Sequence, residues 1–197
     1  MNKPFSQACE NNKPHILSIL TTTLNNSTNL LEIGSGTGQH AVHFAANMPW
    51  LQWQTSDVTD NHNGINQWLS DFPASNLLAP ITLDLNHSWP IKKIDAIYTA
   101  NTLHIVSWPL VQAFFQGVAK HLAKEGKLCI YGPFNYQGKF TSDSNANFNE
   151  WLKERDEDSG IRDIEAITEL AIKSGLKLEN DHEMPANNRL LIFKKLS

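Results

Sequence analysis

Residues 30–44, which read LLEIGSGTGQHAVHF, place three alternate glycines between an apolar stretch and apolar residues at helical spacing. A strand, a glycine turn and a helix in this order bring backbone N–H groups to a ligand at the helix N-terminus, as in nucleotide-binding α/β sheets. A dinucleotide fingerprint, G-x-G-x-x-G, requires its third glycine one residue after Gly38, where this chain has Gln39. The spacing therefore disfavours a dinucleotide, and the alternative is an ordinary strand-to-helix turn. The candidate ligand-binding residues of the turn are Gly34, Ser35, Gly36 and Gly38.

Three acidic residues lie in or at the ends of the predicted strands. Asp57 comes 23 residues after Gly34 (57 − 34), near the ~20-residue spacing between a glycine turn and a ribose-binding acid, and its carboxylate can accept both ribose hydroxyls. Asp84 ends the next strand and is placed to accept from an adenine amino group, with Leu85 against the ring. Glu32 is costly to bury unpaired, so it either organises the glycine turn or receives a ligand's ammonium group. Any one acid could be a turn residue, but the three together favour a ligand site.

A second group of polar side chains follows the fourth predicted strand. Asn101 and His104 stand across the switch point of the sheet from the glycine turn, where ligands bind in open α/β folds. We expect both to act at the reacting atoms, with His104 as a general base or, alternatively, as a structural hydrogen-bonding residue. A base with the usual histidine pKa makes turnover fall below about pH 6.5.

The segment after the fifth strand should cover this second group. Its aromatic residues predict an apolar wall, and its Arg/Asp pairs predict polar contacts to a substrate. The alternatives are ordinary core packing and a solvated helix junction. The candidate substrate-binding residues are Tyr131, Phe134, Arg155, Arg162 and Asn187, accompanied by Tyr136, Phe140, Asp156, Asp163 and Asn188.

Alternating strands and helices predict a doubly wound α/β sheet. Pro14 is expected in the first turn of the first helix, after an irregular segment. The last two strands follow one another without a helix, so they should pair antiparallel at the sheet edge. Helices are predicted at residues 14–24, 38–48, 65–72, from 109, 146–155 and 164–174, and strands at 30–33, 51–57, 80–84, 94–100, 127–131, 176–183 and 189–194.

Length and composition fit a single domain, residues 1–197, whose first 24 residues form a segment and helix covering the ligand site. The formal net charge is −4 and no basic run exceeds two residues, which disfavours general binding to nucleic acid or to an anionic membrane. Cys9 and Cys129 form no C-x-x-C motif, so neither a disulfide framework nor a metal site is expected. The sequence has no signal-like or 18-residue apolar stretch, and we expect a cytoplasmic protein.

The pattern E-x-G-x-G-x-G that begins at Glu32 resembles the first motif of the class I S-adenosylmethionine-dependent methyltransferases. Over nearly the whole chain, further motifs resemble the methyltransferase-like 26 family of small class I homologues. These motifs are residues 36–45, Trp53-Gln54 with Ser56-Asp57, Asn101 with His104-Ile105 and Trp108, Tyr131-Gly132-Pro133-Phe134, Arg155-Asp156 with Gly160-Ile161-Arg162-Asp163, and residues 184–188.

The resemblance implies a Rossmann-like three-layer sandwich with strand order 3-2-1-4-5-7-6, in which strand 7 is antiparallel. It also implies S-adenosylmethionine as cofactor, bound at Gly34, Gly36, Gly38, Asp57 and Asp84, and it implies no known substrate. The chain departs from the family near its start, where Asn11 replaces the usual arginine of a Glu-Arg-Asn-Lys motif. If that arginine touches ligand in the family, the contact is lost or replaced in this chain.

The function expected from these features is methyl transfer from S-adenosylmethionine. After the fourth strand the chain reads NTLH, unlike the D/N-P-P-Y/F associated with methylation of amino groups on nucleobases or glutamine. We therefore expect a small-molecule acceptor, with a protein side chain as the second choice. The alternative function is a non-catalytic module that binds the cofactor or a protein partner. A nicotinamide dehydrogenase is disfavoured by the early third glycine.

Overall fold

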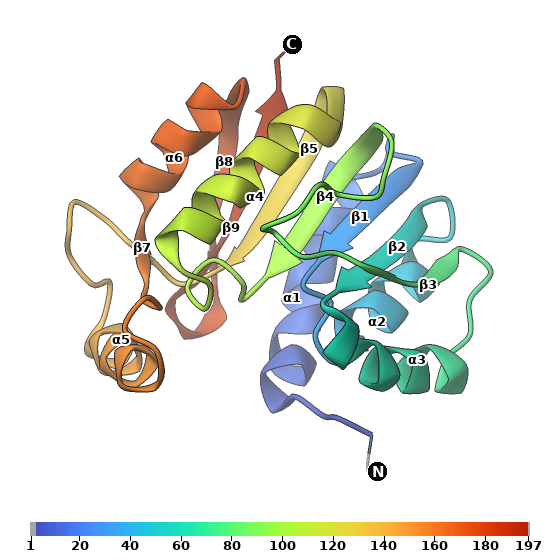
Figure 1. The fold of residues 1–197 in the computed structure, drawn as a ribbon, viewed down its shortest axis with the longest axis horizontal. Helices are drawn as coiled ribbons and strands as arrows, with labels where there is room; N and C mark the ends of the chain where they lie inside the picture. Colours follow the sequence, from blue (N-terminus) through green and yellow to red (C-terminus); the bar gives the residue numbers. More distant parts are fainter. Residues whose placement is uncertain (1–2, 197) are drawn as a thin grey trace.

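The computed structural model describes residues 3–196, which form a seven-stranded sheet covered by helices on both faces (Figure 1). The strands lie in the order β3-β2-β1-β4-β5-β9-β8. The first five are parallel, and β9 is antiparallel to both of its neighbours. Because β8 and β9 are the sixth and seventh strands of this sheet along the chain, the predicted order 3-2-1-4-5-7-6 is confirmed. The strands of the main sheet are β1 Asn29–Ile33, β2 Gln52–Asp57, β3 Leu77–Thr82, β4 Ile94–Ala100, β5 Leu122–Gly132, β8 Leu176–Met184 and β9 Asn188–Lys195, and a second sheet pairs β6 Phe134–Asn135 with β7 Arg162–Asp163.

Two hydrophobic cores fill the space between the sheet and its helices. One core joins the apolar stripe of α1 and the inner face of α2 to the strands, and α3 packs beside α2 on that face. The other core holds the inner faces of α4 and α6 against the opposite face of the sheet (Figure 1). Burial of their apolar faces fixes which side of the sheet α1, α2, α4 and α6 cover, whereas α5 contributes no residue to either core. The helices are α1 Gln7–Thr23, α2 Gln39–Asn47, α3 His62–Asp71, α4 Trp108–His121, α5 Asp143–Arg155 and α6 Ile164–Lys173, with 3-10 turns at Thr59–Asn61 and Pro185–Asn187.

The first helix begins seven residues before the predicted start at residue 14, so the expected irregular segment up to residue 13 was wrong from Gln7 onward. The Ser6 hydroxyl caps the helix by accepting from the Cys9 N–H at 3.3 Å. Pro14 therefore lies inside the helix, although proline is commoner in a first turn. The added turns carry Asn11 and Asn12 to the end of the sheet where the candidate site lies.

The N-terminal segment is tied to the first residue of α2. The Ser6 N–H donates to the Gln39 side chain at 2.6 Å, and the Gln39 amide donates to the Ser6 carbonyl at 3.2 Å. The same amide donates to Glu10 at 2.6 Å. These bonds hold the start of α1 beside the end of the glycine turn.

The third strand ends two residues earlier than predicted, so Asp84 and Leu85 lie in the loop that follows it rather than at the strand end. Pro80 is tolerated because β3 is an edge strand of the main sheet. The loop then crosses in front of the sheet to β4 (Figure 1). Trp89 of this loop is buried in the core beside α4. Gly117 makes this contact possible, because a Cβ at that position would come within 2.2 Å of the Trp89 ring.

Candidate functional site

The glycine turn has a backbone that other residues cannot adopt without strain. Gly34 has φ of 70°, and a Cβ there would come within 2.9 Å of the Thr102 hydroxyl. Gly38 has φ of 89°, and a Cβ there would lie 3.2 Å from the Ile65 Cα. Positive φ and close approach of neighbouring chain both favour glycine. The turn therefore keeps its surface free of side chains, as a nucleotide-binding turn requires.

Glu32 supports this turn from beneath. Its side chain is 2% exposed and accepts from the Trp53 indole N–H and the Ser35 hydroxyl, each at 3.0 Å. Burial, together with the nearby charge of Asp57, raises the Glu32 pKa to about 7 despite these two hydrogen bonds. Of the two roles that the sequence left open, the geometry favours organisation of the glycine turn.

Glu32→Gln should change the pH dependence of stability. The folded protein keeps a proton on Glu32 that the unfolded chain releases above its ordinary pKa of 4.5. The Glu32 contribution therefore lowers the free energy of unfolding as pH rises from 4.5 to about 7, and is constant above that. Gln removes this contribution, so chemical denaturation should show a relative gain for the variant of roughly 3 kcal/mol between about pH 4 and pH 8. A difference between the two proteins that does not change with pH would contradict the assignment.

Asp57 lies at the end of β2 and joins the turn to the next loop. Its Oδ2 accepts from the Gly36 N–H at 2.7 Å, and its Oδ1 accepts from the Val58 N–H and the Asn61 amide, both at 2.8 Å. These donors occupy three of the roughly four acceptor positions of a carboxylate. Asp57 is thus fixed in orientation, with remaining capacity for a ligand hydroxyl.

Asp84 is less constrained than Asp57. Its Oδ1 accepts from the Asn86 N–H at 2.9 Å, and its Oδ2 lies 3.2 Å from the His87 ring. The Asn86 backbone hydrogen bond and the His87 charge lower the Asp84 pKa, so the group is ionised at neutral pH. Leu85 is half-buried and packs against the core on the α4 face. The loop position leaves the adenine contact of both residues a prediction.

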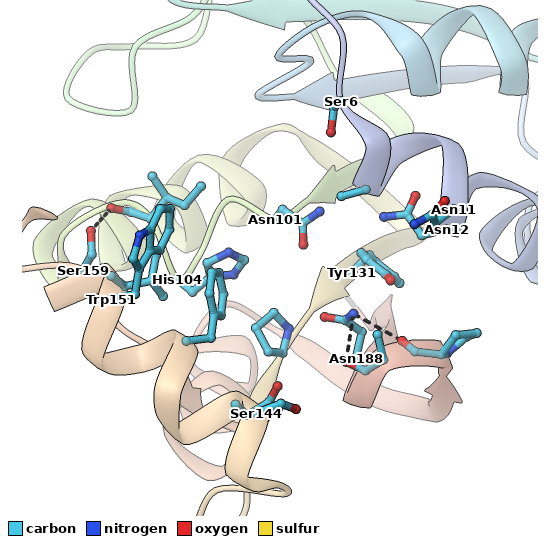
Figure 2. Close-up of a pocket in the computed structure, with 18 of the residues that line it drawn as sticks. Ser6, Asn11, Asn12, Asn101, His104, Tyr131, Ser144, Trp151, Ser159 and Asn188 are labelled. Carbon is cyan, nitrogen blue, oxygen red and sulfur yellow. Dashed lines mark hydrogen bonds between the residues drawn. The ribbon is translucent and has the colours of Figure 1, made fainter. Parts of the chain in front are cut away.

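A cavity of about 910 Å³ lies at the carboxyl ends of β4 and β5, between α1 and α5 (Figure 2). Asparagine amides and aromatic rings dominate its lining. Asn101 takes a left-handed backbone with φ of 55°, which asparagine tolerates better than most residues. The residues predicted from the sequence that line the cavity are Asn101, His104, Tyr131, Arg155, Asp156 and Asn188. The lining also includes Asn11, Asn12, Asn145, Phe148 and Trp151.

His104 is held neutral by its surroundings. Its side chain is 5% exposed, and its ring packs edge-on against Phe148 with centroids 5.5 Å apart. Burial, and then the charge of Arg162, lower the His104 pKa to about 4. The pH threshold near 6.5 expected from the sequence is therefore wrong for this site, because the imidazole is unprotonated well below that pH.

Arg162, Phe134 and Asn187, which were predicted as substrate contacts, are not among the residues that line the cavity. The Arg162 guanidinium donates to the carbonyls of Leu103 and Val106 at 3.1 and 2.6 Å, and so fastens the loop that carries His104. Phe134 is buried in the core, where it packs with α4 and α6 residues. Asn187 lies beside the cavity and donates to Ser144 at 3.3 Å.

Sequence reasoning missed Asn12 and the aromatic pair of α5. Asn12 continues the buried stripe of Ile16 and Leu20 at four-residue spacing, so a polar residue at an apolar position was the available signal. Phe148 and Trp151 stack with centroids 5.7 Å apart and form the wall opposite α1. Their i, i+3 spacing on a short helix is indistinguishable in the sequence from ordinary packing.

Residues 3–195 match the family model described as "Protein of unknown function (DUF938)". The chain belongs to the DUF938 family. Its specific membership in a methyltransferase-like 26 group stays a prediction. Asn11, where the sequence departs from the motif of that group, lines the cavity.

Several solved structures that are similar to this DUF938 protein are named as methyltransferases. An O-methyltransferase family protein from Burkholderia thailandensis superimposes with a TM-score of 0.83 at 13% identity, over 94% of this chain and 56% of that one. The S-adenosylmethionine-dependent methyltransferase SibL superimposes with a TM-score of 0.80 at 14% identity, over 96% of this chain and 56% of that one. An O-methyltransferase family 2 protein from Planctomyces limnophilus, in complex with apigenin, superimposes with a TM-score of 0.76 at 14% identity. The match covers 93% of this chain and 62% of that one. The DUF938 protein thus spans little more than half the length of these proteins, and it has the class I methyltransferase fold.

Residues 3–196 hold neither a metal-binding cluster nor a membrane-spanning helix. In this range no three His, Cys, Asp or Glu side chains are grouped so as to hold a metal ion. No helix of the same range is both long and apolar enough to span a membrane.

Proposed function

We propose that this DUF938 protein transfers a methyl group from S-adenosylmethionine to a hydroxyl group of a small, flat, uncharged molecule. The observation that carries the proposal is the juxtaposition of two sites at one end of the sheet. The glycine turn and Asp57 offer a nucleoside cradle, and the cavity begins beside that cradle at Asn101 and extends to the neutral His104.

The cradle fits the cofactor because it keeps side chains away from the backbone of the turn. At Gly34, a Cβ would come within 2.9 Å of the Thr102 hydroxyl, and the Gly36 N–H is already turned toward the acid at the end of β2. In the proposal, Asp57 binds the ribose, and Asp84 with Leu85 binds the adenine. When bound, S-adenosylmethionine would supply a methyl carbon on a cationic sulfur. An acceptor oxygen would attack that carbon in line with the departing sulfur, which leaves as S-adenosylhomocysteine.

Within the cavity, His104 acts as the general base in this proposal. A ring nitrogen of its neutral imidazole takes the proton that the attacking hydroxyl releases as the new C–O bond forms and the C–S bond breaks. Asn101 lies between the glycine turn and the imidazole, where it positions the hydroxyl. A large part of the catalysis then comes from holding the two reactants in line.

The lining of the cavity supports an uncharged, flat acceptor. Phe148 and Trp151 present stacked rings along one wall, while asparagine amides on the other side both donate and accept hydrogen bonds. Arg155 and Asp156 are the two charged side chains of the lining, and they are neighbours at the end of α5. Arg155 lies over the Trp151 ring, with its guanidinium carbon 4.6 Å from the ring centroid.

S-adenosylhomocysteine should raise the melting temperature of the protein, whereas NAD should leave it unchanged. A ligand present at one hundred times its Kd that binds the folded state alone adds about 2.7 kcal/mol to the free energy of unfolding. A thermal shift assay with both sulfur ligands and both nicotinamide dinucleotides checks the choice. Stabilisation by NAD without a response to either sulfur ligand would overturn the proposal.

Turnover is then tested by screening small hydroxylated aromatic compounds for production of S-adenosylhomocysteine. Binding of the cofactor with no product from any acceptor class would favour the non-catalytic alternative. The Asp57→Ala variant serves as the control for background hydrolysis.

A further inference from the structure

A chain of polar side chains runs from the core of the protein to the wall of the cavity. The Tyr98 hydroxyl lies 3.3 Å from His40 Nδ1, and His40 Nε2 lies 2.6 Å from Asn12 Oδ1. Tyr98 is fully buried, His40 is 5% exposed, and Asn12 is 7% exposed and lines the cavity. Such a chain needs every member satisfied, because an unpaired buried polar group is costly.

Only one placement of the protons lets Tyr98, His40 and Asn12 all make their hydrogen bonds. Burial, with the nearby charges of His43 and Lys13, lowers the His40 pKa to about 3, so the ring is neutral and has one N–H and one acceptor nitrogen. If Nε2 bears the proton, it donates to Asn12 Oδ1, and Nδ1 accepts from the Tyr98 hydroxyl. In the reverse arrangement the Tyr98 O–H has no acceptor among residues 3–196. The first arrangement is therefore the stable one.

This arrangement fixes the Asn12 amide. Its oxygen is held toward His40, so its NH₂ group is the part that remains for the cavity and for the Tyr131 hydroxyl. Burial raises the Tyr131 pKa and hydrogen bonding with Asn12 opposes that rise, as expected when the amide N–H points at the phenol oxygen. An amide has two N–H groups, so with its oxygen held by His40 the Asn12 side chain can point one N–H at the phenol oxygen and the other at a ligand oxygen.

The position of Asn12 indicates which ligand oxygen that is. Its partner His40 is the second residue of α2, directly after the glycine turn, and α2 has no acidic residue in its first turn. Asn12 lies on α1, across the cavity from Trp151 and α5 (Figure 2). Asn12 thus lies on the side of the cavity next to the start of α2, a helix N-terminus that favours negative charge, and away from the aromatic wall.

We propose that the Asn12 NH₂ group binds the carboxylate of the amino-acid portion of S-adenosylmethionine, and that His40 is the positioning residue that holds the amide in this orientation. The proposal rests on the proposed function, since it concerns the same cofactor. It adds a binding residue on α1 and a buried histidine whose role is exerted through that residue. Asn101 and the glycine turn contact the rest of the cofactor.

The test compares two probes, S-adenosylhomocysteine and 5′-methylthioadenosine, which has the same nucleoside but no amino-acid portion. Asn12→Asp replaces the donor with an acceptor and should weaken the binding of S-adenosylhomocysteine about 10- to 100-fold, the usual range for a hydrogen bond to a charged group. Calorimetry measures this affinity. Affinity for methylthioadenosine should be unchanged. Asn180→Asp, on the exposed edge strand β8, makes the same charge change far from the site and should alter neither affinity.

Equal losses for both probes, or no loss for either, would overturn the role of Asn12 while leaving cofactor binding intact. Failure of the wild-type protein to bind S-adenosylhomocysteine would overturn the proposed function as well. Asn12→Ser provides a smaller variant should the aspartate prevent folding, with the same selective loss expected. In the wild type, ¹⁵N NMR should show His40 protonated at Nε2, and protonation at Nδ1 would reverse the amide and contradict the proposal.

Discussion

Asp57→Ala should weaken binding of S-adenosylhomocysteine by at least about 100-fold. Two effects combine in this loss. The variant loses the charge-assisted hydrogen bond from the carboxylate to a ribose hydroxyl, worth roughly 1.5–3 kcal/mol, and every 1.4 kcal/mol corresponds to a tenfold change in affinity. The substitution also removes the acceptor of the Gly36 N–H, which is 2.7 Å from Asp57 Oδ2, so the glycine turn loses a fixed point.

Calorimetry on a matched series separates these effects. Asp57→Asn keeps the size of the side chain but removes the charge, and should bind with intermediate affinity. Asp84→Ala should lose roughly tenfold, because an exposed carboxylate in a loop offers one hydrogen bond to an amino group. Circular dichroism establishes that each variant is folded. Wild-type affinity in Asp57→Ala would show that the ribose is bound elsewhere.

His104→Ala should lower the rate of methyl transfer by about 10²–10⁴, the usual contribution of a general base, and leave the affinity for S-adenosylhomocysteine nearly unchanged. The expected pH profile follows from the pKa near 4 that burial and Arg162 give to His104. Because the neutral imidazole is the active form, turnover should stay level as pH falls from about 8 to 5, and decline only when the ring protonates near pH 4. Initial rates over this range check both statements.

Two observations would contradict this role for His104. Loss of cofactor affinity with normal turnover at saturation would place the imidazole against the cofactor. Wild-type cofactor affinity together with wild-type turnover in His104→Ala would make His104 a structural residue, packed against Phe148. His15→Ala, an exposed position on α1, is the matched control and should behave like the wild type.

The alternation of strands and helices was predictable from the sequence because each element carries its own periodic pattern, whereas the strand order was implied by the resemblance to class I methyltransferases. The limits of the helices were harder to predict, and the start of α1 is the example. Pro14 resembles a helix start, yet Ser6 caps the helix and the buried stripe of Ile16 and Leu20 extends back to Asn12. Packing against α2 decides where this helix begins, and that contact is invisible in a local pattern.

One part of the candidate site could also be predicted from the sequence, and another part could not. The glycine turn follows β1 directly, Glu32 lies within β1 and Asp57 is the last residue of β2, so their grouping could be predicted. The cavity wall could not, because the two helices on either side of the cavity, α1 and α5, are more than one hundred residues apart in the sequence. Arg162 shows the difficulty: its charge suggested a substrate contact, but its guanidinium is occupied by the carbonyls of the His104 loop.

The placement of β9 between β5 and β8 has a consequence for the order of events during translation. Among the described strands, β8 pairs with β9 alone, and β5 has β9 as its neighbour on that side. Until Asn188–Lys195 leaves the ribosome, the largely apolar edge of β5 has no partner and β8 cannot join the sheet. An open strand edge of this kind readily pairs with other chains. The emergence of one eight-residue strand therefore sets the moment at which the nascent sheet becomes protected from aggregation.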